Sequence, residues 1–183
     1  MRSYKAEGII LKRSNFGEAD RILTIFTRNH GKVKVIAKGV RRITSRRSPN
    51  IELFNLVTLY IHKGRALDIL TEAQVENTFS DFRKNLKLVG LSYYICELID
   101  SLCAENQAHP KVYELLFSAL TYLNNISHLS DDGLRIIERF EKALLAELGF
   151  LPSKPALAVD TTSYIEQILE RRIKTRRLLS RLV

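Results

Sequence analysis

The first eighty residues contain five short hydrophobic runs, and in the last three of them hydrophobic and polar side chains alternate with a period of two. Turn residues bound the runs, and Asn29-His30-Gly31 between the second and third is typical of a hairpin turn. The strands predicted by this pattern are Tyr4–Lys12, Asp20–Thr27, Gly31–Lys38, Phe54–Lys63 and Ala66–Glu76. Five strands with no helical pattern between them predict a small closed β-barrel, of the OB type or, as the alternative, of the SH3-like type.

The hydrophobic period changes from 2 to 3.6 near residue 80, which predicts helices in the rest of the chain. The apolar stripe of the first helix is Leu91, Ile95, Leu98, Ile99 and Leu102. The second helix is expected to begin at His109-Pro110, because proline is favoured in the first turn. The third is expected to begin after Ser130 and stop at Gly149, and a basic fourth helix to span Ser163–Val183. The sequence therefore predicts an α+β chain with a barrel domain at residues 1–79 and an all-helical domain at residues 80–183.

Basic residues are concentrated in the predicted barrel. The formal net charge is +9, and residues 1–80 hold 15 basic against 7 acidic side chains. No Asp or Glu occurs between Arg21 and Ile51, and Gly31–Arg47 alone holds seven Lys and Arg residues. A strand that presents cations on one side, next to an arginine-rich turn, is suited to hold the backbone of a polyanion. This pattern favours nucleic acid as the partner.

The motifs of common catalytic and metal sites are absent from the sequence. The chain has no Gly-x4-Gly-Lys-Ser/Thr phosphate loop, and its four histidines and two cysteines show no metal-ligand spacing. We therefore expect no catalysis, no metal and no cofactor. The enzymatic alternative is a metal-dependent nuclease in which Glu7, Glu18 and Asp20 hold Mg²⁺. No apolar run reaches the length of a membrane span, and Cys96 and Cys103 are expected to be reduced, which indicates a cytoplasmic protein.

Three groups of residues resemble those of a known family. The first is Gly8-Ile9-Ile10-Leu11, then Phe16-Gly17-Glu18-Ala19-Asp20-Arg21-Ile22-Leu23 and Phe26-Thr27. The second is Gly31 through Ala37-Lys38-Gly39-Val40-Arg41-Arg42, followed by Ser45-Arg46. The third is Glu97-Leu98, Leu144-Leu145 and Leu148-Gly149-Phe150-Leu151-Pro152. In order and spacing these segments resemble the RecO family of bacterial recombination and repair mediators, and Lys174-Thr175-Arg176 is similar to a Lys-Ser-Arg element of that family.

The resemblance implies an N-terminal OB fold, a helical domain and binding to single- and double-stranded DNA. It also implies annealing of complementary strands, contact with the C-terminal tail of the single-strand-binding protein, and assembly with RecR to help load RecA near the bacterial nucleoid. Many family members carry a four-cysteine zinc module after the Gly-Phe-Leu-Pro segment, whereas Ser153–Asp160 contains no cysteine. The chain therefore looks like a minimal member without zinc. The alternative is a generic OB-fold accessory protein that binds RNA or DNA.

The cations that match the family's basic positions are Arg13, Arg21, Lys38, Arg41, Arg42 and Arg46. The charge pattern adds Lys34 and Arg47, and all eight are expected to neutralise phosphates without reading sequence. Phe16 is the first candidate for stacking on bases, and His30 is the second. Arg135 and Arg139, about one turn apart in the third predicted helix, are candidates for binding the acidic partner tail.

Overall fold

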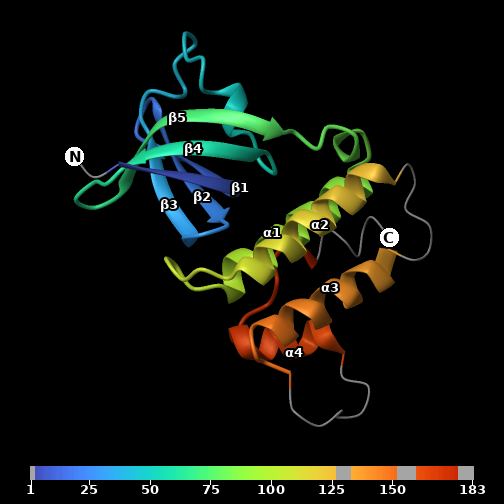
Figure 1. Cartoon of the computed structure of the whole chain (residues 1–183). Coiled ribbons are helices and arrows are strands. Elements are labelled where there is room, and N and C mark those ends of the chain that lie inside the picture. Colours follow the sequence, from blue (N-terminus) through green and yellow to red (C-terminus); the bar gives the residue numbers. More distant parts are fainter. Residues whose placement is uncertain (1–2, 127–132, 152–159, 177–183) are drawn as a thin grey trace. The chain divides into compact units, whose positions relative to one another are not determined.

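The computed structural model describes residues 3–126, 133–151 and 160–176 (Figure 1). Contacts divide the chain into two compact units. The first holds Met1–Phe79 together with Cys103–Tyr113, and the second holds Ser80–Leu102 and Glu114–Val183. The stretch Cys103–Tyr113, called the strap below, therefore packs with the strands, although the sequence pattern assigned it to the helical part.

The first unit is built on a closed β-barrel. Its strands are β1 (Ser3–Phe16), β2 (Asp20–Thr27), β3 (Gly31–Ala37), β4 (Leu56–His62) and β5 (Asp68–Asn77). They follow the order β1-β2-β3-β5-β4, and β1 pairs with β4 to close the barrel (Figure 1). All neighbouring strands are antiparallel except β3 and β5. This five-stranded arrangement is of the OB type, so the leading fold prediction is confirmed.

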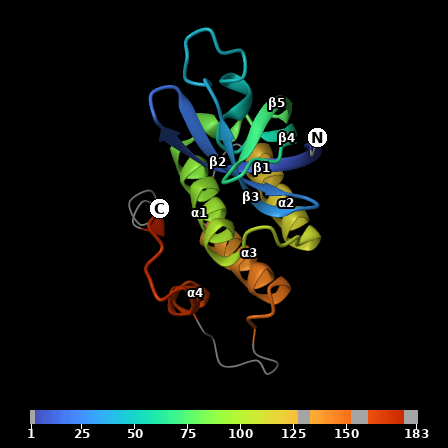
Figure 2. The same ribbon diagram turned by 90° about the vertical axis from the view of Figure 1, so that its left-hand side faces the viewer.

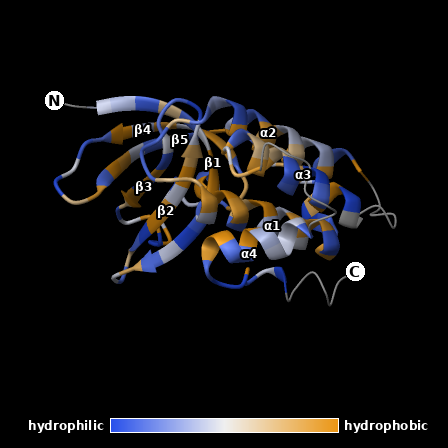
Figure 3. Cartoon of the chain, turned by 90° about the horizontal axis from the view of Figure 1, so that it is seen from below, coloured by the Kyte–Doolittle hydropathy of each residue, from blue (hydrophilic) through white to orange (hydrophobic). Residues whose placement is uncertain are grey.

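The barrel interior explains the period of two in the sequence, because alternate side chains of a strand point to opposite faces. Ile10, Leu23, Val35, Leu59 and Leu70, one from each strand in turn, are buried together in the core. Figure 3 shows hydrophobic and hydrophilic residues following one another along these strands. Full burial of an aliphatic side chain contributes about 1.5–3 kcal/mol, so this core is the main source of the barrel's stability.

Strand β1 is longer than predicted, since it continues beyond Lys12 to Phe16. Its first part pairs with β4, and its last part pairs only with β2, where Phe16 lies opposite Asp20. A register shift between Ile10 and Lys12 separates the two parts. The prediction ended the strand too early because residues 12–15 are all polar, so this stretch, which pairs across the short turn to β2, shows no hydrophobic alternation.

The contact that closes the barrel between β3 and β5 is short. Only Val35 and Ile36 of β3 pair with β5. The earlier part of β3 is instead covered by the strap, whose Asn106 N–H donates to the Lys32 carbonyl oxygen at 2.8 Å. A parallel bridge between Lys32 and Glu105 extends this contact. The strap therefore protects a strand edge that would otherwise offer unpaired backbone groups.

The helices of the chain are α1 (Leu86–Leu102), α2 (Pro110–Asn125), α3 (Gly133–Glu147) and α4 (Thr161–Leu169). The predicted start of the second helix at Pro110 is confirmed, and the third ends shortly before Gly149 as expected. Ser130, the expected N-cap of the third helix, lies outside the described residues. Along α1 the predicted apolar stripe is buried except for Leu102, which is partly buried, and Leu91 and Leu98 are both inaccessible to solvent.

The fourth helix is shorter than predicted. It begins after Asp160, whose carboxylate accepts the Thr162 N–H at 3.2 Å, and it ends at Leu169. Glu170 then adopts a left-handed backbone conformation with a φ of 52°, which ends the helix. The predicted continuation is therefore wrong over residues 170–175, and residues 177–183 lie outside the described part of the chain.

Glu97 on α1 positions the segment that follows α4. Its carboxylate accepts the N–H groups of Lys174 and Thr175 at 2.9 and 2.8 Å, and the Thr175 hydroxyl at 2.7 Å. Partial burial acts to raise the pKa of Glu97, but these hydrogen bonds and the charge of Arg171 outweigh burial and hold the pKa below its usual value. The segment is thus fixed by a residue far away in the sequence, which the local helical period could not reveal.

A matched pair of glycine substitutions tests the docking of the strap. Gly31 and Gly17 both have positive φ, 65° and 55°, so alanine at either site is expected to cost about 1–2 kcal/mol of unfolding free energy. At Gly31 the new Cβ would also collide with the Gln107 carbonyl oxygen, whereas at Gly17 nothing lies within 4 Å. Urea unfolding should therefore show a loss for Gly31→Ala that exceeds the Gly17→Ala loss by about 1–3 kcal/mol. Equal losses would contradict this position of the strap.

Candidate nucleic-acid interface

Most of the predicted cations lie on the connection between β3 and β4, residues 38–55, called the basic loop below. Figures 1 and 2 show this loop projecting from one end of the barrel. Both of its ends are anchored in the barrel core, where Val40 and Ile51 are fully buried. In the exposed part, the Ser45 N–H donates to the Arg42 carbonyl oxygen at 2.9 Å. The basic loop is therefore a folded element with defined turns.

The basic loop is joined to the turn between β1 and β2. The Asp20 carboxylate accepts the Gly39 N–H at 2.7 Å. The backbone N–H of Arg41 donates to the Ala19 carbonyl oxygen at 2.9 Å, and its guanidinium donates to the Gly17 carbonyl oxygen at 3.1 Å. These bonds bring two segments that are separated in the sequence into one surface at the end of the barrel.

Arg47 fastens the far side of the basic loop to the strands. Its guanidinium donates to the Leu70 carbonyl oxygen on β5 at 3.0 Å and to the Lys38 carbonyl oxygen at 2.7 Å. A hydrogen bond from a charged group typically contributes about 1.5–3 kcal/mol. Arg47 therefore has a structural task, and contact with phosphate stays a prediction for it.

Three other predicted cations are partly engaged. Arg13 Nη1 lies 2.5 Å from Glu52 Oε1, and Lys34 forms an ion pair with Glu105 of the strap. Arg21 keeps one guanidinium nitrogen buried without a hydrogen-bond partner among the described residues. The pair between Lys34 and Glu105 is exposed, and because such ion pairs contribute only about 0–1 kcal/mol, a phosphate group can compete with Glu105 for Lys34.

Lys38, Arg42 and Arg46 are the exposed cations of this surface that carry their charge unopposed. Within the described part of the chain, their side chains form no hydrogen bond or ion pair. All three line an open hollow of about 550 Å³ in the basic loop. The remaining lining residues are Asp20, Gly39, Thr44, Ser45 and Arg47. A concave surface lined by cations of this kind attracts anions from solution.

Phe16 lies at the end of β1 and is 51 % exposed, so its ring is not part of the barrel core. It lies opposite Asp20, next to the turn that is joined to the basic loop. An exposed aromatic ring beside a cationic surface is the arrangement that single-stranded nucleic acids use for stacking. Base stacking on Phe16 stays a prediction.

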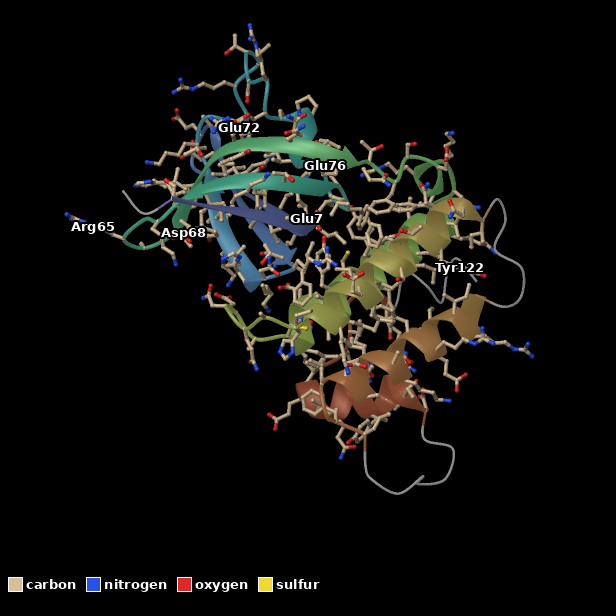
Figure 4. The ribbon with its side chains drawn as sticks, in the orientation of Figure 1. Glu7, Arg65, Asp68, Glu72, Glu76 and Tyr122 are labelled. Carbon is tan, nitrogen blue, oxygen red and sulfur yellow. The ribbon has the colours of Figure 1, made fainter. Side chains whose placement is uncertain are left out.

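Sequence reasoning missed a second cationic turn, between β4 and β5. Figure 4 shows Arg65 at the tip of this turn, pointing away from the barrel. Lys63 lies over the Tyr4 ring, with its Nζ 5.4 Å from the ring centroid, and the Tyr4 ring is 4.8 Å from the ring of His30. In OB folds the β1–β2 and β4–β5 loops and the β2–β3 face bind oligonucleotides. The sequence could have revealed this turn through Lys63 and Arg65, the basic residues on either side of Gly64.

In the second unit, Arg135 and Arg139 occupy exposed positions on α3. A hollow of about 750 Å³ lies elsewhere in this unit, at the start of α1 and the end of α2. Its lining includes Lys84 and the apolar side chains of Leu86 and Ile126, and Leu86 is 69 % exposed. The two predicted arginines are not among the residues that line this hollow.

The nuclease alternative finds no support in the described residues. Asp20 binds the backbone of the basic loop, while Glu7 accepts a hydrogen bond from the Tyr113 hydroxyl at 2.9 Å. Across residues 3–126, 133–151 and 160–176, no group of three or more His, Cys, Asp or Glu side chains could hold a metal ion. None of the helices described is long and apolar enough to cross a membrane.

Comparison with known protein families agrees with the barrel and the helical unit. The family model "Recombination protein O N terminal" matches residues 1–79, and "Recombination protein O C terminal" matches residues 83–154. The chain belongs to the RecO family. Its residues 1–79 are thus the family's N-terminal region, which holds all of the predicted phosphate contacts.

Curated relatives carry the name DNA repair protein RecO. The protein from Symbiobacterium thermophilum is 35 % identical over 156 residues, which is 85 % of this chain and 60 % of the relative. The protein from Pelotomaculum thermopropionicum is 32 % identical over 152 residues, which is 83 % of this chain and 57 % of the relative. The RecO protein from Listeria monocytogenes is 29 % identical over 164 residues, 88 % of this chain and 63 % of the relative. The chain thus spans roughly three fifths of the length of the RecO relatives it matches.

Substitution of two neighbouring arginines in this RecO-family chain, Arg46 and Arg47, tests whether Arg47 holds the basic loop in place. Arg47→Ala removes the hydrogen bonds to the Leu70 and Lys38 carbonyl oxygens, so we expect a loss of about 1–3 kcal/mol in unfolding free energy. Arg46→Ala removes an exposed side chain that has no partner in the described part of the chain, and it should change stability by less than about 0.5 kcal/mol. Urea unfolding of both variants measures the difference, and a similar loss for both would show that Arg47 does not hold the loop.

Proposed function

We propose that this RecO-family chain binds single- and double-stranded DNA through phosphate contacts and anneals complementary strands. The observation that carries the proposal is a cluster of exposed cations at the end of an OB-type barrel, Lys38, Arg42 and Arg46, which have no side-chain partner among the described residues. Arg41, fixed to the β1–β2 turn, lies on the same loop. These cations neutralise phosphates and release condensed counterions, so binding does not depend on base sequence.

Annealing follows from which part of the DNA is held. Contacts to phosphates leave the base edges of a bound strand free to pair with a second strand. Neutralised phosphates also reduce the repulsion between the two strands as they approach. No covalent step and no nucleotide hydrolysis are needed for this activity. We therefore propose a non-enzymatic mediator rather than a nuclease or an ATPase.

We further propose that the helical unit supplies protein contacts, in keeping with the family. The expected partners are RecR and the acidic C-terminal tail of the single-strand-binding protein, so that the complex helps to load RecA in the bacterial cytoplasm. An acidic, apolar tail needs an apolar surface beside a cation. The two candidate places are Arg135 and Arg139 on α3, and the hollow where Lys84 adjoins the exposed Leu86.

Removal of the three unpaired cations tests the DNA proposal. If about six phosphate contacts form on a single strand, the slope of log K against log salt should be about −4. The variant Lys38→Ala/Arg42→Ala/Arg46→Ala removes three contacts, so the slope should become less steep by about 2, and annealing without ATP should slow in parallel. Fluorescence anisotropy at several salt concentrations and a strand-pairing assay with complementary oligonucleotides measure the two effects.

The control variant Lys84→Ala/Lys87→Ala/Lys142→Ala removes the same charge from the helical unit and should leave the slope unchanged. If both triple variants change the slope equally, binding follows net charge rather than the basic loop. Binding without annealing by the unaltered protein would favour a generic accessory protein, and Mg²⁺-dependent strand cleavage would overturn the proposal.

The ion pair between the strap and β3 should restrain DNA binding. Glu105→Gln keeps the size of the side chain and removes the negative charge that competes with a phosphate for Lys34. Since an exposed ion pair contributes about 0–1 kcal/mol, we expect single-strand affinity to rise by about two- to five-fold at low salt. The same substitution in a Lys34→Ala background should give no gain. A gain of equal size in both backgrounds would show that Lys34 makes no phosphate contact.

A further inference from the structure

The side-chain hydroxyl of Ser45, in the basic loop, is a buried polar group that lacks a hydrogen bond within the described part of the chain. The backbone N–H of Ser45 is already used, since it donates to the Arg42 carbonyl oxygen. A buried hydroxyl left without a partner costs about 1–3 kcal/mol, so native proteins rarely keep one without a reason. Ser45 is one of the residues that line the hollow of about 550 Å³.

The charge around this hydroxyl is strongly positive. The hollow is lined by four cations and one carboxylate: Lys38, Arg42, Arg46, Arg47 and Asp20. The Asp20 carboxylate accepts the Gly39 N–H, and the Arg47 guanidinium is bound to carbonyl oxygens. The other three cations have no side-chain partner among the described residues, so they can donate hydrogen bonds to a ligand in the hollow. The hollow thus calls for an anion with several acceptor oxygens and more than one negative charge.

We propose that this hollow is a receptor for the terminal phosphate of a DNA strand, an inference that rests on the DNA-binding function proposed above. A phosphate monoester carries a charge of about −1.5 to −2 at neutral pH and three free acceptor oxygens. An internal phosphodiester has a single negative charge and two such oxygens, so it satisfies fewer of the donors. The volume of about 550 Å³ exceeds that of a phosphate and is enough for the nucleotide attached to it.

Such a receptor recognises the end of a DNA strand, whereas the other proposed phosphate contacts do not distinguish one position along the DNA backbone from another. The loop that holds the strand end is tied to the β1–β2 turn through Asp20 and Arg41, and the exposed ring of Phe16 lies beside that turn. A strand whose end is fixed in the hollow therefore starts next to an aromatic surface on which its bases can stack. A preference for phosphorylated ends would direct the protein to broken or processed strands.

The test compares one short oligothymidylate in three forms: with a 5′-phosphate, with a 3′-phosphate, and with hydroxyls at both ends. Anisotropy at moderate salt should show that one phosphorylated form binds about tenfold more tightly than the unphosphorylated form, and the favoured form identifies the end that is held. Inorganic phosphate should weaken binding of the favoured form more than binding of the unphosphorylated oligonucleotide, and so reduce this advantage. Equal affinity for all three forms would overturn the receptor but leave the proposed DNA binding intact, whereas no binding of any form at low salt would refute both.

Two serine variants locate the receptor. Ser45→Ala removes the unpaired hydroxyl and should abolish most of the end preference without changing affinity for the unphosphorylated strand. Ser48→Ala makes the same change in the same loop outside the hollow and should keep the preference. Urea unfolding confirms that both variants are folded. If Ser45→Ala keeps the full preference, the phosphate is held elsewhere, and if it weakens all three forms equally, the hollow takes an internal phosphodiester.

Discussion

The short pairing between β3 and β5 is the constraint on which the rest of the first unit depends. Only Val35 and Ile36 join the two strands, yet this contact is needed for the sheet to close into a barrel. Since β3 ends at Ala37, the chain must reach β4 through the long basic loop, which has no sheet ladder to hold it. Buried Val40 and Ile51, together with side-chain bonds, provide that support instead.

Because the basic loop needs this support, some of its cations hold the loop in place and others are left to interact with a ligand. Arg47 and Arg41 hold the basic loop against carbonyl oxygens of the strands and of the β1–β2 turn. Lys38, Arg42 and Arg46 remain unpaired among the described residues, so their charge is available to a ligand. Net charge alone therefore overstates the number of cations that are available to a ligand. What matters for binding is which cations lack a partner once the loop has been fixed.

Short closure also leaves the early part of β3 exposed, and the strap covers it. Bare strand edges promote unwanted pairing, so this cover has a direct benefit for a protein with a small sheet. It also brings Glu105 to Lys34, on a strand whose face binds oligonucleotides in OB folds. The strap thus has two effects on β3. It covers the edge of the strand, and its Glu105 carboxylate offsets the positive charge of Lys34.

The sequence by itself determined the five strands, the OB-type barrel, the starts or ends of the helices at Pro110 and Gly149, and the concentration of cations after β2. These features depend on residues close together in the chain, where the periods of 2 and 3.6 are visible. The tertiary structure decided that β1 runs on to Phe16, that the fourth helix stops before Glu170, and that certain cations are paired. The extension of β1 pairs residues across the short turn to β2, where hydrophobic alternation gives no signal. The other outcomes depend on partners far apart in the sequence, such as Glu97 for the segment after α4. A local pattern carries no information about such partners, because they meet only when the chain has folded.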